Sequence, residues 1–222
     1  RVGDDRQLPP VCDPYSTDAR VRSPLLQQIS GGVEVWLTVC RRAAKALYDL
    51  YREWAPPVDE LLDRFHYGGR IGHYNLCISN AQRRRLVVKV NSRYEDAPGA
   101  VFVPKDKDPE STDLWIAPGV ELVARTTEKA RKVYNNAFYT VLAVTPSIRL
   151  RDDDVGREIE IPLGSIQKYF RGRGALTYDG AQGRTLQGRV VCFGLKSKRM
   201  TREHLVVGIS RATALEFFAC AP

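Results

Sequence analysis

Several short segments of this 222-residue chain carry side chains that are suited to holding phosphate groups. The arginines Arg42 and Arg211 each present a planar guanidinium, which stays charged and can grip phosphate oxygens with two parallel hydrogen bonds. Gln7 has a neutral amide that can both donate and accept hydrogen bonds. Ser79 and Asn80 follow an apolar run, where hydroxyl and amide groups at a helix start can bind phosphate without reading a base sequence. These residue types favour a protein that handles nucleotides or nucleic acids.

Four segments, taken in their order along the chain, resemble the motor motifs of superfamily 1 helicases. The resemblance is strongest to the 5′-to-3′ branch that includes RecD and Pif-type enzymes. The segments are GDDRQLPPV at 3–11, LTVCRR at 37–42, LCISN at 76–80, and ALTYDGAQGRT at 175–185 followed by VGISRAT at 207–213. The first is similar to the GDxxQLPPV stretch that joins the two motor lobes of these enzymes. In the last, both signatures and their spacing match the family.

The resemblance implies roles for individual residues. Arg211 is the arginine finger, which stabilises the charge that spreads over the γ-phosphoryl oxygens in the transition state. Gln7 senses the terminal phosphate of the nucleotide, and Arg42 reaches the nucleotide phosphates from the opposite lobe. Gln182 and Gly183 lie near the nucleotide. The DNA contacts that the resemblance implies or that basic charge suggests are Ser79, Asn80, Thr177, Thr185 and Arg125.

Most of these assignments have a plain structural alternative. Arg42 could be a solvated arginine at a helix start, and Ser79 and Asn80 could serve only to cap a helix. Arg125 could belong to a basic hairpin edge that merely resists aggregation. The family also usually carries His or Lys where Asp179 and the next residue stand. Because a carboxylate cannot attract phosphate, a DNA contact at that turn is in doubt.

The sequence lacks the elements with which such an enzyme binds ATP by itself. No GxxxxGK[ST] pattern occurs, and the run GLKS at 194–197 lacks the glycine beside the lysine. The pair Asp59-Glu60 sits in an amphipathic stretch, whereas a magnesium-binding pair would follow a β-strand. We therefore expect ATP and Mg²⁺ to be bound mainly by an upstream RecA-like lobe of the same protein, and this chain alone to be inactive.

The segments that must position these residues contain both helices and strands at the two ends of the chain and mainly short strands between. We expect strands at 73–78, 175–178, 190–193 and 216–219, and helices at 38–54, 81–91 and 201–207. Short β-type runs occupy 121–126, 138–144, 148–151 and 158–161. This pattern and the resemblance together predict an α/β fold, a RecA-like parallel sheet with helices on both faces, interrupted by a small antiparallel β insertion that is SH3-like.

The same pattern predicts the organisation into domains. Residues 1–12 would be the end of the first motor lobe and the linker, and 93–168 the β insertion. The second RecA-like domain would comprise 13–92 and 169–222.

Composition narrows the class of protein only moderately. A net charge of +8 and a sequence pI near 9.4 favour an acidic partner such as nucleic acid, although many basic surfaces serve only solubility. The five cysteines are scattered and form no CxxC pair, so neither a disulfide framework nor a zinc site is indicated. The sequence has no run of roughly 18 apolar residues and no secretory signal. We expect an intracellular protein without a membrane partner, nuclear or at a site of DNA replication, and possibly virus-encoded.

The function predicted from the sequence is therefore the C-terminal motor region of an ATP-dependent DNA helicase that translocates on single-stranded DNA and unwinds duplex, in replication or repair. This chain would supply the arginine finger and part of the DNA grip. Two alternatives stay open. One is a nucleic-acid-binding module whose motor lobe has degenerated, and the other is an RNA-directed viral helicase of the same superfamily.

Overall fold

The computed structural model describes residues 24, 28, 31, 40–53, 55–68 and 70–221. The chain divides into two compact units, one formed by Arg1–Arg70 with Ala181–Pro222 and the other by Ile71–Gly180. Gln7 and most of the first two sequence motifs lie outside the described residues.

The unit that contains the C-terminal segment holds a pair of parallel strands and the helices packed with them. Its elements are α3 (Lys45–Tyr51), α4 (Val58–Arg64), β10 (Val190–Cys192), α8 (Arg202–Ile209), the 3-10 turn η4 (Leu215–Phe217) and β11 (Phe218–Cys220). Val190 pairs with Phe218 and Cys192 with Cys220. Every residue of these two strands is buried, as is typical of parallel strands that are covered on both faces.

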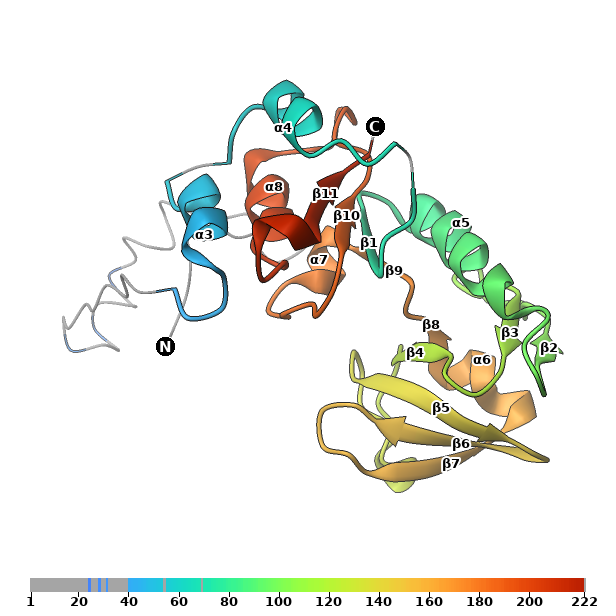
Figure 1. Ribbon diagram of the computed structural model, residues 1–222. Coiled ribbons are helices and arrows are strands. Elements are labelled where there is room, and N and C mark those ends of the chain that lie inside the picture. The colour runs from blue at the N-terminus through green and yellow to red at the C-terminus, as the bar shows by residue number, and fades with distance from the viewer. Residues whose placement is uncertain are drawn as a thin grey trace. The chain divides into compact units, whose positions relative to one another are not determined.

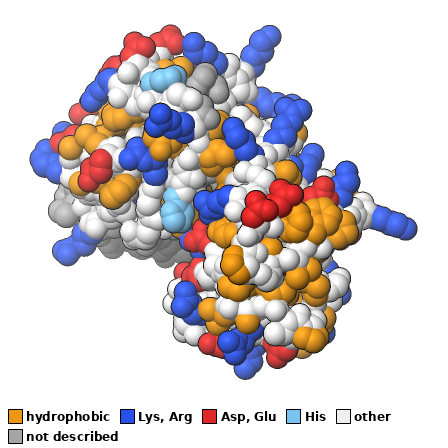
Figure 2. Space-filling model, turned by 45° about the vertical axis from the view of Figure 1, so that its right-hand side comes forward, with side chains coloured by type: hydrophobic (Ala, Val, Ile, Leu, Met, Phe, Trp, Pro, Cys, Tyr) orange, Lys and Arg blue, Asp and Glu red, His pale blue; other side chains and the backbone are white. Residues whose placement is uncertain are grey.

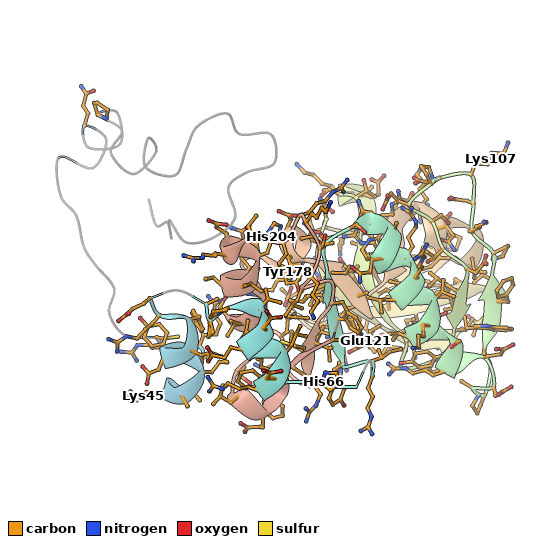
Figure 3. The ribbon with its side chains drawn as sticks, turned by 90° about the horizontal axis from the view of Figure 1, so that it is seen from above. Lys45, His66, Lys107, Glu121, Tyr178 and His204 are labelled. Carbon is orange, nitrogen blue, oxygen red and sulfur yellow. The ribbon has the colours of Figure 1, made fainter. Side chains whose placement is uncertain are left out.

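Helix α8 brings the arginine segment to its place. The helix begins with a capping box, in which the Thr201 side chain accepts a hydrogen bond from the His204 backbone and the His204 ring accepts one from the Thr201 backbone. His204 is labelled on this helix in Figure 3. The five residues from Leu205 to Ile209 are all buried, so the helix is enclosed on most of its circumference. Ser210 and Arg211 follow directly and are therefore also buried.

The second unit contains another parallel strand pair and the longest described helix. Its strands β1 (Tyr74–Cys77) and β9 (Ala175–Thr177) are parallel neighbours. Helix α5 (Asn80–Asn91) follows β1 and starts at Ser79, whose hydroxyl accepts a hydrogen bond from the Gln82 backbone at 3.2 Å. Figure 1 shows α5 running from the end of β1 towards β2 and β3.

The rest of this unit is formed by two antiparallel sheets and short turns. A hairpin pairs β2 (Val101–Val103) with β3 (Leu114–Ile116). A five-stranded sheet has the order β7-β6-β5-β4-β8 and comprises β4 (Glu121–Ala124), β5 (Phe138–Val144), β6 (Ser147–Asp152), β7 (Glu158–Pro162) and β8 (Phe170–Gly172). Burial alternates along β6 and β7, so one face of the sheet is packed and the other is exposed. The short helical elements are η1 (Ser92–Tyr94), η2 (Lys129–Arg131), η3 (Leu163–Ser165), α6 (Ile166–Tyr169) and α7 (Tyr178–Ala181).

The element types agree with the sequence-based expectations, while several boundaries differ. Helix α3 covers 45–51 of the helix expected over 38–54. The strand expected at 216–219 starts only at Phe218, because a 3-10 turn closes with a hydrogen bond from the Phe217 backbone to the Ala214 carbonyl oxygen. The short strands β2, β3 and β8 were not predicted, whereas the equally short β9, β10 and β11 overlap strands expected from the sequence. β8, at 170–172, pairs with β4 in the five-stranded sheet, although it lies after residue 168.

Arg173 and the glycines beside it join the five-stranded sheet to the parallel pair and to α5. A Cβ atom at Gly172 would lie 2.6 Å from the Val87 side chain, and one at Gly174 would lie 2.5 Å from Val90, so only glycine permits this approach to α5. Between them Arg173 is 7% exposed. Its guanidinium forms ion pairs with the carboxylates of Glu121 and Asp153 and a hydrogen bond with the hydroxyl oxygen of Tyr74. Of these partners, Glu121 belongs to β4, Asp153 to the turn after β6 and Tyr74 to β1.

Candidate nucleotide and nucleic-acid sites

Arg211, the expected arginine finger, is completely buried. Its Nε donates to the Val207 carbonyl oxygen at 3.1 Å, which closes the last turn of α8. Its Nη1 donates to the carbonyl oxygens of Ala181 and Arg184, and its Nη2 donates to Ser210 Oγ at 2.7 Å. These acceptors are uncharged oxygens, and they fix the guanidinium against the turn at 181–184.

The turn that Arg211 holds presents two residues of the Gln-Gly signature. The Arg184 backbone N–H donates to the Ala181 carbonyl oxygen at 3.2 Å, which closes the turn. Gly183 has a φ of +82° and is exposed, a backbone conformation that suits glycine. Gln182 is half-buried. The side chain of Arg211 therefore determines the shape of the loop in which Gln182 and Gly183 stand.

The segment around Arg42 lies next to the segment that carries Arg211. The Ala44 backbone N–H donates to the Thr213 carbonyl oxygen at 2.8 Å. Arg42 is exposed and stands in the turn before α3, two residues from this hydrogen bond. The fold thus brings together the second and fourth sequence motifs, which are far apart along the chain.

A thiol lies in the same turn as Arg42. Cys40 Sγ is 3.7 Å from the Tyr51 hydroxyl and is partly exposed. Burial raises the pKa of Cys40, but backbone hydrogen bonds from Ala43 and Arg42, together with the Tyr51 hydroxyl and the Arg42 charge, lower it more. The net pKa is below that of an ordinary thiol. Burial also raises the pKa of Tyr51, so its hydroxyl stays protonated at neutral pH.

We expect Cys40 to be the most reactive of the four described cysteines, because the thiolate is the nucleophile and needs access to solvent. Burial raises the pKa of Cys77 to about 12 and also raises that of Cys220. With limiting iodoacetamide near neutral pH, peptide mass spectrometry should show Cys40 alkylated at least about tenfold faster than Cys77. The Cys40 rate should rise with pH and level off above its pKa.

A matched variant tests the cause of this reactivity. Arg42→Gln removes a positive charge beside the thiolate, so the pH profile of Cys40 should move to higher pH. Equal alkylation of Cys40 and Cys77 in the folded wild-type chain would contradict the assigned environment.

The residues expected to contact DNA differ in their exposure and in the hydrogen bonds that they form. Thr177 is half-buried, and its Oγ1 accepts a hydrogen bond from the Gly180 backbone at 3.1 Å at the start of α7. Thr185 is exposed. Ser79 caps α5, as described above, and Asn80 Oδ1 accepts a hydrogen bond from Arg83 Nε at 3.1 Å. The capping alternative for Ser79 is therefore realised in this structure, and the DNA contacts stay predictions.

Arg125 is committed to an interaction within the protein. Its Nη2 pairs with the Asp108 carboxylate, its Nη1 donates to the Gln167 carbonyl oxygen at 3.4 Å, and its side chain is 17% exposed. The guanidinium thus holds the loop that contains Asp108. A DNA contact by Arg125 would require it to leave or share these partners.

Sequence reasoning missed the buried arginines. Arg83 stands in the basic run QRRR at 82–85, and a charge run on a helix usually forms a solvated face, yet Arg83 is 1% exposed and pairs with Glu110. A signal was present, because Arg83, Leu86, Val87 and Val90 recur at three- and four-residue steps and so share the buried face of α5. Arg173 offered no comparable signal, since its partners come from three other segments.

The electrostatic character of the surface is mixed. In Figure 2, Lys and Arg side chains are spread over the visible face, with Asp and Glu side chains among them. Among the described residues, no group of three or more His, Cys, Asp or Glu side chains could hold a metal ion. No helix within the described ranges is long and apolar enough to cross a membrane.

Comparisons with solved structures match this chain to Pif1 helicases. A structure of two coordinating Pif1 helicases at forked double-stranded DNA has a TM-score of 0.58 and 21% identity, over 82% of this chain and 48% of that chain. Bacteroides Pif1 bound to single-stranded DNA has a TM-score of 0.58 and 18% identity, over 84% and 51%. Bacteroides Pif1 with ADP-AlF3 and single-stranded DNA has a TM-score of 0.61 and 20% identity, over 99% and 61%. No protein-family model and no curated protein matches the chain.

At these identities the likeness is one of fold, and the chain spans about half the length of the first two structures. The class is therefore a RecA-like α/β protein with a parallel sheet and additional antiparallel sheets. More specifically, the chain has the fold of the C-terminal region of a Pif1-type superfamily 1 helicase. This confirms the fold class and the resemblance on which the sequence analysis relied.

Proposed function

We propose that this chain is the C-terminal motor region of an ATP-dependent DNA helicase, in which it supplies the arginine finger and part of the grip on single-stranded DNA. The observation that carries the proposal is the hydrogen bond between the Ala44 backbone and the Thr213 carbonyl oxygen. It places the turn of Arg42 beside the segment of Arg211, as a shared phosphate-sensing surface requires. One solved structure with this fold is of Bacteroides Pif1 helicase in complex with ADP-AlF3 and single-stranded DNA.

In this proposal the residues of the chain complete a nucleotide site whose phosphate cradle belongs to another lobe. The described residues fit a sensing role and not a metal-binding one, because they include arginines but no cluster of acidic ligands. Mg²⁺ bound by the other lobe would neutralise phosphate charge. Arg42, exposed in its turn, can reach an external phosphate, and Gln182 can contact the nucleotide from the turn at 181–184.

Arg211 needs a rearrangement to act as a finger. A guanidinium that contacts the γ-phosphoryl oxygens has to exchange carbonyl acceptors for phosphate ones, and the gain in charge-assisted hydrogen bonding favours that exchange. Closure of the two lobes on ATP would then be linked to the shape of the turn at 181–184. The five-stranded sheet, which we interpret as the SH3-like insertion, would help to hold the DNA strand.

The proposal is tested with a form of the protein that contains the upstream lobe, compared with the 222-residue chain alone. The longer form should hydrolyse ATP faster in the presence of single-stranded DNA and should separate a duplex with a single-stranded tail. The chain alone should show no ATP hydrolysis. Stimulation by DNA and by RNA of equal length, measured in parallel, identifies the polynucleotide.

Two results would overturn this function. DNA binding without ATP hydrolysis by the longer form would favour a binding module with a degenerate motor. Hydrolysis by the 222-residue chain alone would show that its ATP site is complete, contrary to the proposal.

A further inference from the structure

The loop between β2 and β3, residues 104–113, is fixed by buried polar contacts although most of it faces solvent. Gln167, 6% exposed, donates from Nε2 to the Thr112 carbonyl oxygen at 2.8 Å and accepts from Ser111 Oγ at 3.0 Å. Ser111 Oγ also accepts from the Asp106 backbone at 2.9 Å. The loop is therefore preorganised, which is a property of binding loops that lose little entropy when a ligand arrives.

The acidic residues of this loop stabilise its conformation by accepting hydrogen bonds and forming ion pairs. Asp106, Asp108 and Asp113 each accept a backbone N–H of the loop at 2.8 Å, from Asp108, Glu110 and Lys105 respectively. The hydrogen bond from the Glu110 backbone has the largest effect on the pKa of Asp108, and together with Arg125 it outweighs the opposing effect of burial, so that pKa is lowered. The Glu110 carboxylate is shared by two guanidinium groups, those of Arg83 and Arg84.

Three cations of the loop and of the facing side of α5 are not used in ion pairs of this kind. Arg85, Lys105 and Lys107 are exposed and form no side-chain ion pair within the described part of the chain. Lys107 extends outward from the loop in Figure 3. The groove between α5 and the loop has a volume of about 640 Å³, and Arg84, Arg85, Lys105 and Lys107 line it. Val88, 43% exposed, and Pro109 add apolar lining.

We propose that this groove binds a short stretch of a single nucleic-acid strand, with phosphates on the basic side chains and sugar or base against the apolar lining. Cations stand on both sides of the groove, one set from α5 and one from the loop, which suits a polyanion lying between them. Asp106, Asp108 and Asp113 also line the groove. Asp108 is paired with Arg125 and the nearby Glu110 with Arg83 and Arg84, so these two carboxylates oppose a phosphate less than unpaired ones would.

This inference takes its class of partner from the proposed function but names a different site. None of the residues assigned to DNA from the sequence motifs lines the groove. Arg125 contributes to the groove only indirectly, because its ion pair with Asp108 helps to fix the loop. The contacts are to phosphate, so the site should not select a base sequence.

The experiment measures binding of a fluorescent oligo-dT to the 222-residue chain by anisotropy over a series of NaCl concentrations. The variant Arg85→Gln/Lys105→Gln/Lys107→Gln removes three exposed cations of the groove. Each lost phosphate contact should reduce the slope of log K against log salt by about 0.7 for a single strand, so the triple variant should lose about 2. The matched control, Lys198→Gln/Arg199→Gln/Arg202→Gln, changes the net charge equally at exposed positions in the other unit and should lose much less.

The outcomes distinguish binding at the groove from nonspecific attraction to positive charge and from the proposed motor function. Equal slopes for the groove variant and the control would overturn the proposal, as would equally tight binding of polyglutamate to the wild-type chain. If the triple variant does not fold, Lys107→Gln alone, at an exposed position, should still lower the slope by about 0.7. If the longer form hydrolyses ATP and unwinds DNA while the groove variant binds oligo-dT as tightly as wild type, binding at the groove is refuted and the proposed function is left intact.

Discussion

Replacing Arg211 by alanine in a form of the protein that contains the upstream lobe is expected to reduce DNA-stimulated ATP hydrolysis by about 10³- to 10⁵-fold, the range typical of an arginine finger. The physical reason is that no other group supplied from this segment can neutralise the charge that develops on the γ-phosphoryl oxygens. The measurement is kcat for ATP at saturating single-stranded DNA. Wild-type hydrolysis by the folded variant would remove Arg211 from this role.

The burial of Arg211 requires a second measurement beside the rate. Alanine also leaves the carbonyl oxygens of Val207, Ala181 and Arg184 without this donor, at a cost of about 1–3 kcal/mol for each one that stays unsatisfied. Thermal unfolding of the same variant shows how much protein is folded. A loss of kcat that only matches the loss of folded protein would make Arg211 a structural residue.

Ser210→Ala is the matched control for Arg211→Ala. It removes one acceptor of the guanidinium and a hydrogen bond to the Val207 carbonyl oxygen, but keeps the positive charge. We expect a modest loss of stability, about 1 kcal/mol, and a change in kcat of less than about tenfold. A loss as large as that of Arg211→Ala would show that the position of the guanidinium, and not only its charge, is decisive.

Arg173→Met is expected to lower the free energy of unfolding by about 3 kcal/mol, measured with urea. The substitution leaves the carboxylates of Glu121 and Asp153 without their buried cation, and their side chains are only 24% and 22% exposed. It also removes a cation that lies 4.2 Å from the centre of the Phe138 ring. Because water still reaches the two carboxylates in part, we expect a value near the lower end of those for broken buried pairs.

Arg149→Met is the control for the effect of an arginine in the same sheet. Arg149 pairs with Glu158 at 3.6 Å, and both side chains are more than half exposed. Its replacement should change the free energy of unfolding by less than about 1 kcal/mol. If the two variants are equally stable, the contacts of Arg173 do not hold the five-stranded sheet to β1.

Much of the fold could be predicted from the sequence because its signals are local. Ser79 before the helical run marks the start of α5, and alternation marks β6 and β7. The order of the four motifs led to the class of fold that the comparisons with Pif1 helicases confirm. The strands β2, β3 and β8 and the 3-10 turn at Leu215–Phe217 were not predicted, because such short elements depend on pairing partners that are distant in the chain.

The sequence by itself determined which residues are chemically able to act on phosphate, since that depends on side-chain type alone. Only the tertiary structure decided how they are used. It buries Arg211 against the turn at 181–184. It leaves Arg42 exposed, two residues from the hydrogen bond between Ala44 and Thr213, and it pairs Arg125 with Asp108. A guanidinium has the same charge everywhere, but its role depends on which acceptors surround it, and those come from segments that only folding brings together.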